Sequence, residues 1–243
     1  MTGSADVPST EPSNASRRAA AAHVVIADVG RDADEVVPVD GDTEHHLRRV
    51  LRLRQGEIVT VTDLRGKWRL AEVGGDRDRV RLVAARPVVT EAPRATPITL
   101  AVAIPKGDRL DWMVQKVTEL GLDRLVLLHA ARSTTRWDAD RAATQLDRLR
   151  RISVEACRQS RRVWGLEIEG PCPAGDVLGS AVVAEPGGRR LDVDDTVIAI
   201  GPEGGWDDDE LAAARGRVSL GPNILRVETA AVAATALRVI LGH

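Results

Sequence analysis

The sequence predicts an α/β protein with a parallel sheet in its C-terminal part and a small β-barrel domain before it. Residues 23–85 hold short runs with strand-like alternation, and residues from 98 onward hold continuous apolar strands between amphipathic helices. Apolar strands that alternate with helices are typical of parallel sheets covered on both faces. The 243 residues, 43% of them hydrophobic, are enough for one large or two small domains.

The first expected domain follows a tail. Residues 1–20 are rich in Ser, Pro, Ala and Thr, which predicts disorder. Residues 21–86 form the expected barrel, with one helix over residues 43–52, where Leu47 and Leu51 share a face. Its expected strands are residues 23–29, 57–63, 67–73 and 79–84, with Gly66 in the turn of the hairpin.

The second expected domain begins after a linker over residues 87–97, which lie in a stretch with three prolines and no periodicity. It occupies residues 98–243. Its expected strands are residues 98–104, 124–129, 177–185, 196–201 and 218–220. Its expected helices are residues 108–120, 139–162, 207–215 and 229–241.

The composition of the chain bears on which classes of function are possible. The net charge is −2, so the chain has no overall basic character; its 34 basic residues are nearly all Arg, which suits phosphate contacts but also fits a biased genome. Two cysteines without a CxxC pattern argue against a metal site. The absence of a long apolar run or signal peptide predicts a cytoplasmic protein that does not enter a membrane. Without Phe or Tyr, stacking on bases would need Trp, His or Arg.

A glycine-rich loop is the strongest local signal. In VIAIGPEGGWDDDEL, a buried strand leads into GPEGG and then into a helix with Asp207 as the expected N-cap. Glycines let a ligand approach the backbone, and parallel sheets bind ligands at the carboxyl ends of their strands. The alternative is an ordinary glycine-rich turn. Neither GxGxxG nor GxxxxGK[ST] is present, and the acidic residues would repel a phosphate.

The C-terminal segment VSLGPNILRVETAAVAATALRVIL is a second signal. A short strand ends at Gly221, an irregular stretch follows, and an Ala-rich helix is expected from Thr229. Small side chains allow a helix to lie close to another backbone. From the residues alone, the segment equally fits a tightly packed C-terminal helix.

These two segments resemble a known family. GPEGG followed by LGPNILRVETAA resembles the C-terminal signature of the SPOUT methyltransferases. Within that superfamily the chain resembles the RsmE family, which makes N3-methyluridine in 16S ribosomal RNA. HHLRRVLRLRQGEIVTVTD is similar to the family's PUA-like domain. IPKGDRLDWMVQKVTELGLDRLVLLHAARS and EACRQSRR are similar to the start and the middle helix of its methyltransferase domain, so the resemblance spans residues 23–241.

The resemblance implies a PUA-like RNA-binding barrel at residues 21–86 and a trefoil-knotted domain at residues 98–243. It implies S-adenosylmethionine as cofactor, held in the knot by the backbone of three loops. The cofactor-binding residues that it implies are Ala184, Glu185, Gly201, Pro202, Glu203, Gly204, Gly205, Leu220, Gly221, Ile224 and Leu225.

The implied activity is methylation of N3 of a uridine in 16S ribosomal RNA by a homodimer, with the small ribosomal subunit as partner. The alternatives are a knotted methyltransferase for another base or a ribose 2′-oxygen, and a non-catalytic RNA-binding relative. Arg226 is the expected orienting residue and Glu228 a candidate base; the alternative is an ion pair between them. The candidate RNA contacts, for which surface solvation is the alternative, are Arg48, Arg49, Arg52, Lys106, Arg132, Arg161 and Arg162.

Overall fold

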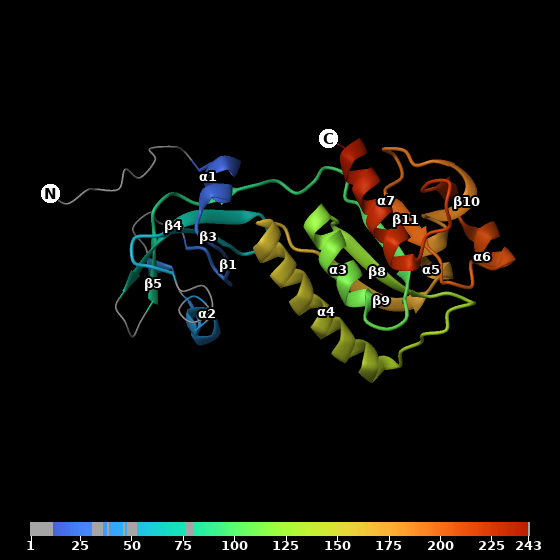
Figure 1. Ribbon diagram of the computed structural model, residues 1–243, viewed down its shortest axis with the longest axis horizontal. Helices are drawn as coiled ribbons and strands as arrows, with labels where there is room; N and C mark the ends of the chain where they lie inside the picture. The colour runs from blue at the N-terminus through green and yellow to red at the C-terminus, as the bar shows by residue number, and fades with distance from the viewer. Residues whose placement is uncertain are drawn as a thin grey trace. The chain divides into compact units, whose positions relative to one another are not determined.

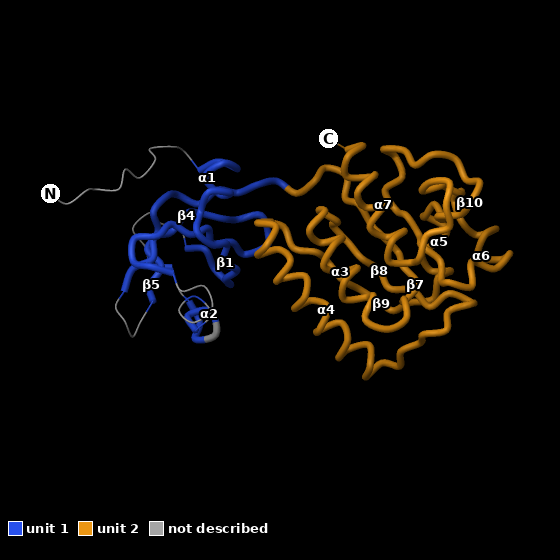
Figure 2. The backbone as a smooth tube through the Cα atoms, in the orientation of Figure 1, with its two compact units in different colours: residues 1–92 blue, residues 93–243 orange. Residues whose placement is uncertain are grey.

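The computed structural model divides into two compact units, residues 1–92 and residues 93–243 (Figure 2). The structure describes residues 12–30, 36–37, 39–45, 47, 53–75 and 80–242. The division falls among the residues 87–97 that the sequence indicated as a linker. Part of that stretch is ordered into the first unit, because strand β6 (Val89–Thr90) pairs with β4.

The first unit is built on one sheet with the strand order β1-β3-β4-β5-β2. These strands are β1 (His23–Val25), β2 (Val36–Val37), β3 (Ile58–Thr62), β4 (Lys67–Gly75) and β5 (Val80–Ala84). The expected hairpin is confirmed: β3 and β4 pair antiparallel, and Gly66 takes a positive φ of 92° between them. Helix α2 covers Gly41–His45, and buried Leu47 lies beyond it. The remainder of the expected helix over 43–52 lies outside the described residues.

Helix α1 (Asn14–Ala19) corrects the expectation of a tail disordered through residue 20. Arg17 anchors it: the guanidinium donates to Glu91 at 2.7 Å and lies 5.3 Å from the centre of the Trp68 ring. The buried Trp68 indole donates to the same carboxylate. The Arg17–Glu91 ion pair and the contact of Arg17 with the Trp68 ring therefore hold α1 in place, although the composition of this segment does not predict a helix.

The second unit is an α/β domain with the all-parallel strand order β12-β10-β11-β7-β8-β9, as the alternation of strands and helices predicts (Figure 1). Its strands are β7 (Thr99–Ala103), β8 (Arg124–His129), β9 (Glu167–Pro173), β10 (Val182–Arg190), β11 (Val197–Ile200) and β12 (Gly216–Ser219). Its helices are α3 (Arg109–Leu120), α4 (Ala139–Ser160), α5 (Gly175–Leu178), α6 (Asp208–Ala213) and α7 (Val227–Leu241).

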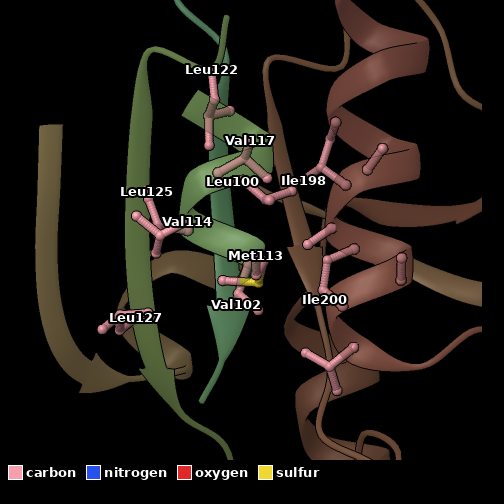
Figure 3. Packing of buried hydrophobic residues seen from close by; sticks show 14 of the residues in the cluster. Leu100, Val102, Met113, Val114, Val117, Leu122, Leu125, Leu127, Ile198 and Ile200 are labelled. Atoms are coloured by element: carbon pink, nitrogen blue, oxygen red, sulfur yellow. The ribbon is translucent and has the colours of Figure 1, made fainter. Parts of the chain in front are cut away.

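Alternation along β7 explains how the sheet is covered on both faces. Leu100 and Val102 belong to one buried cluster, which Figure 3 shows between the sheet and the helices α3 and α7. Ala101 and Ala103 point to the opposite face, where they pack with Leu178 of α5. The four residues Leu100–Ala103 are all buried, which is why the strand forms a continuous apolar run.

Three elements of the second unit differ from the expectation: β9, α5 and β10. Strand β9 was not predicted, because it is an edge strand in which Ile168 is the one fully buried side chain. The strand expected over residues 177–185 begins later, since α5 occupies its first residues, and it extends to Arg190. The other expected strands and helices of the second unit are present, with bounds that differ by a few residues at most.

Asp195, in the connection between β10 and β11, holds three segments together. Its buried carboxylate accepts two hydrogen bonds from Arg189, at 2.6 and 2.7 Å, and one from Arg215 at 3.1 Å. Its backbone oxygen accepts one from Arg238 of α7. Hydrogen bonds from the Arg189 guanidinium hold the pKa of Asp195 below its usual value, although burial acts in the opposite direction.

Candidate functional site

A cavity of about 410 Å³ lies where β10, β11 and the segment after β12 meet. The pairing of β10 with β12 is interrupted between Ala184 and Arg189, so residues 185–188 leave the ladder at this point. The cavity lies beside this irregularity and beyond the end of β11. Ten of the eleven residues expected to bind the cofactor line it: Ala184, Glu185, Gly201, Pro202, Glu203, Gly205, Leu220, Gly221, Ile224 and Leu225.

The eleventh residue, Gly204, lies in the same loop but contacts a different element. A side chain at Gly204 would meet Cβ of Arg132 at 3.1 Å, and Arg132 donates to the Gly204 oxygen at 3.3 Å. Asp207 and Glu210 form the expected capping box of α6, and Glu210 also accepts from the backbone of Ala131. The glycine loop is therefore fixed to the segment after β8.

Trp206 forms part of the cavity wall and was missed from the sequence. Its ring is buried against Gly201, where a Cβ atom would lie 2.9 Å from the indole. The indole Nε1 has no hydrogen-bond partner among the described residues. Because Trp206 directly follows the glycine-rich loop in the sequence, its position could have indicated a cavity-wall residue. Pro186, Ile200, Ser219, Asn223, Val227 and Ala230 also line the cavity and are sequence neighbours of the expected residues.

The lining combines apolar side chains, exposed backbone and negative charge. Gly205 and Gly221 take positive φ values and have open space where a side chain would stand, so a ligand can reach their backbone. The carboxylates of Glu185 and Glu203 are both in the wall. Arg226 lines the same cavity, so the lining carries two carboxylates and one guanidinium, which suits a ligand with positive charge and apolar surface better than a phosphate.

Arg226 and Glu228 lie at the start of α7 but do not pair with each other. Arg226 is the exposed N-cap residue, lines the cavity, and makes no ion pair within the described ranges. Glu228 is buried, and its Oε1 lies 3.6 Å from Nε of Arg109. The alternative of an Arg226–Glu228 ion pair is therefore wrong.

Arg109, the first residue of α3, was missed by the sequence reasoning. Its guanidinium pairs with Glu228 and reaches Glu203 of the glycine loop at 4.0 Å. The second oxygen of Glu228 is buried and has no hydrogen-bond partner in the described part of the chain. Arg109 thus connects α3 to both segments that line the cavity, and one carboxylate oxygen of Glu228 is left buried without a partner among the described residues.

The four candidate RNA contacts that the structure describes lie in different environments. Lys106 and Arg132 are exposed on segments that follow β7 and β8. Arg161 ends α4 in a left-handed conformation. Arg162 is a correction: its guanidinium donates to the backbone oxygens of Thr118 and Leu122, at 2.7 and 2.9 Å, so it fastens α4 to α3. The remaining three, Arg48, Arg49 and Arg52, lie outside the described residues.

The described residues contain no group of three or more His, Cys, Asp or Glu side chains placed to hold a metal ion. None of the helices formed by these residues has the length and apolar character needed to cross a membrane.

An α/β domain with a ligand cavity at its strand ends, preceded by a small β domain, is the architecture of an RNA methyltransferase. Residues 91–239 match the model of the RNA methyltransferase domain, and residues 39–84 match that of the RNA methyltransferase PUA domain. The chain belongs to the ribosomal RNA small subunit methyltransferase E family, as its sequence motifs predicted.

Individual relatives match over most of their length. The Mycobacterium bovis ribosomal RNA small subunit methyltransferase E is 33% identical over 231 residues, which cover 84% of this chain and 86% of that protein. The Synechocystis protein of the same name is 34% identical, with 79% and 69% covered. The crystal structure of the Neisseria gonorrhoeae protein bound to S-adenosyl methionine has a TM-score of 0.76 at 27% identity, with 89% of this chain and 95% of that chain covered.

Proposed function

We propose that this enzyme transfers a methyl group from S-adenosylmethionine to N3 of a specific uridine in the 16S ribosomal RNA of the small subunit. The observation that carries the proposal is the acidic, glycine-walled cavity between β10, β11 and the start of α7. Family membership supports the RNA substrate. The PUA domain of the first unit is the part of the chain that we expect to select the RNA.

The residues present fit S-adenosylmethionine. The cavity volume of about 410 Å³ lies within the range of small-molecule sites. Gly205 and Gly221 have open space where a side chain would stand, so an adenine can lie close to the backbone there. Glu185 and Glu203 supply negative charge for a ligand that carries a sulfonium and an ammonium group.

Replacing Gly201 by alanine should weaken S-adenosylmethionine binding at least ~10-fold, because the new methyl group would displace the buried Trp206 ring from the cavity wall. Overpacking of this kind costs roughly 1–3 kcal/mol. Calorimetric titration checks the affinity. Gly179→Ala is the matched control, since its Cβ would contact nothing and its φ is −58°. Equal affinities for the two variants would contradict the packing argument.

The chemistry requires a deprotonated imide. The cofactor supplies an activated methyl group, so the protein has to orient uracil N3 and accept its proton. Arg226, exposed at the cavity mouth, is placed to stabilise negative charge on the uracil oxygens. Glu228 stays the candidate proton acceptor: Arg109 fixes its carboxylate through one oxygen, and the other oxygen is buried without a partner among the described residues, next to Val227 of the cavity lining.

The trefoil knot and the dimer are parts of the proposal. After β12, at the edge of the sheet, the chain returns to α7, which packs on β7, β11 and α3 (Figure 1). We place the knot at this return, beneath the β10–β11 connection that holds Asp195. A homodimer is supported by the exposed apolar side chains of Leu237, Ile240 and Leu241 on α7. We expect the enzyme to act in the cytoplasm.

The decisive experiment uses small subunits from a strain that lacks this enzyme. Purified protein and S-adenosylmethionine should restore one N3-methyluridine, mapped by nuclease digestion and mass spectrometry of the 16S ribosomal RNA. A methyl group on a ribose 2′-oxygen or on another base would replace the assignment with a related activity. Cofactor binding without any methyl transfer to RNA would favour a non-catalytic relative.

A further inference from the structure

Trp112 is the one exposed tryptophan of the protein. The sequence has no Phe and no Tyr, and all five Trp lie among the described residues. Trp68, Trp137 and Trp206 are buried, and Trp164 is partly buried with its Nε1 covered. The Trp112 side chain is 46% exposed. Among the tryptophans, Trp112 is therefore the one well-exposed candidate for stacking of a nucleobase.

The surroundings of Trp112 suit a nucleotide. The ring lies in the first turn of α3 and borders a shallow hollow lined by Lys106, Gly107, Asp108 and Arg109. Lys106 is exposed and makes no ion pair within the described ranges, so its ammonium is available to a phosphate. The negative charge of Asp108 offsets the positive charge of Lys106. The carboxylates of Glu203 and Glu228 partly neutralise Arg109. We therefore expect the ring, more than the charge, to provide the affinity.

The hollow adjoins the cofactor cavity. Arg109 lines the hollow, and its guanidinium reaches Glu203 of the cavity wall at 4.0 Å and Glu228 at 3.6 Å. Arg109 thus lines the hollow beside Trp112 and also contacts a carboxylate of the cofactor-cavity wall. A nucleotide next to the target would lie over Trp112 without entering the cofactor cavity.

We propose that Trp112 is the stacking platform for an unpaired nucleobase adjacent to the target uridine, with Lys106 contacting its phosphate. The inference rests on the proposed function, because it presumes an RNA substrate in the neighbouring cavity. Aromatic stacking recognises single-stranded RNA with little sequence preference, since every base has a π face. This site therefore holds an RNA loop open beside the target and leaves sequence selection to other contacts.

The test measures binding of a single-stranded, uridine-containing RNA oligonucleotide and of deproteinised 16S ribosomal RNA to the full chain. Trp112→Ala should weaken both about 5- to 100-fold, the range for the loss of one stacked base. Trp112→Phe should retain most of the affinity, whereas Trp112→Leu, which keeps apolar bulk without a ring, should behave like the alanine variant. Lys106→Gln should reduce the slope of log affinity against log salt by ~0.7.

Controls separate stacking from other roles. Val193→Ala removes an apolar side chain with a similar exposure of 45% and should change nothing. Calorimetric S-adenosylmethionine binding should be unaffected by Trp112→Ala. Wild-type RNA affinity in Trp112→Ala, or equal losses in the Phe and Leu variants, would overturn the stacking platform. A changed sedimentation mass of Trp112→Ala would also overturn it, because the ring would then pack against a second copy of the chain.

Failure of the proposed function has a different signature. In that case the wild-type enzyme would bind S-adenosylmethionine without methylating 16S ribosomal RNA at N3 of a uridine. The comparison of Trp112→Ala with Trp112→Phe needs no turnover, so it still decides whether the ring stacks on RNA.

Discussion

Arg226→Ala should lower kcat for methylation by at least ~100-fold, the usual cost of removing one donor that stabilises developing negative charge. Arg226 lines the cavity, and no other arginine in the described part of the chain does so. The guanidinium is exposed, caps α7 without a side-chain hydrogen bond, and makes no ion pair within the described residues. Its removal should therefore change the free energy of unfolding by no more than about 0.5 kcal/mol.

The measurement combines steady-state kinetics on small subunits with calorimetry and urea unfolding. Arg226→Lys is the informative companion, because it keeps the charge and loses the planar fork. Partial activity in the lysine variant would assign the effect to charge, and none would assign it to the geometry of the guanidinium. Near-normal turnover of Arg226→Ala would remove this residue from the mechanism.

Asp195→Asn should lower the stability of the second unit by roughly 2–4 kcal/mol at neutral pH, a large loss for a substitution that keeps the size of the side chain. Breaking a buried ion pair leaves its partner uncompensated, which typically costs 3–5 kcal/mol. We reduce that figure because Arg189 and Arg215 are about half exposed and can regain water. Equilibrium urea unfolding measures the difference from wild type. Glu169→Gln is the matched control, since its pair with Arg124 is exposed on both sides and should contribute no more than about 1 kcal/mol.

The stabilisation that Asp195 provides should decrease in acid. The folded-state pKa of Asp195 lies below the ordinary 3.8, chiefly through hydrogen bonds from Arg189. Its contribution to stability is therefore complete above that ordinary value and is lost as the pH falls through the folded-state pKa. The difference between wild type and Asp195→Asn should accordingly shrink as unfolding is measured at pH values progressively below 3.8. A difference that grows in acid would contradict the ion-pair argument.

Local patterns predicted the scaffold and most of the cavity. The strand ending at Gly201 and the segment around Leu220 lie together because parallel strands end at one edge of the sheet. Arg109 could not be predicted in this way, because it is far in sequence from both of its carboxylate partners. Arg162 belonged to an arginine-rich helix end, and periodicity does not reveal a guanidinium that turns back to backbone oxygens. The edge strand β9 lacks the apolar run that identifies the central strands.

The contact between Trp206 and Gly201 also gives the enzyme a built-in optical probe. In a chain without tyrosine or phenylalanine, near-ultraviolet absorption and emission come from five indoles. The indole of Trp206 is buried in the wall of the cofactor cavity, and its Nε1 is unpaired among the described residues. A ligand that fills the cavity would alter the emission of this indole, so cofactor exchange can be followed in real time without a label.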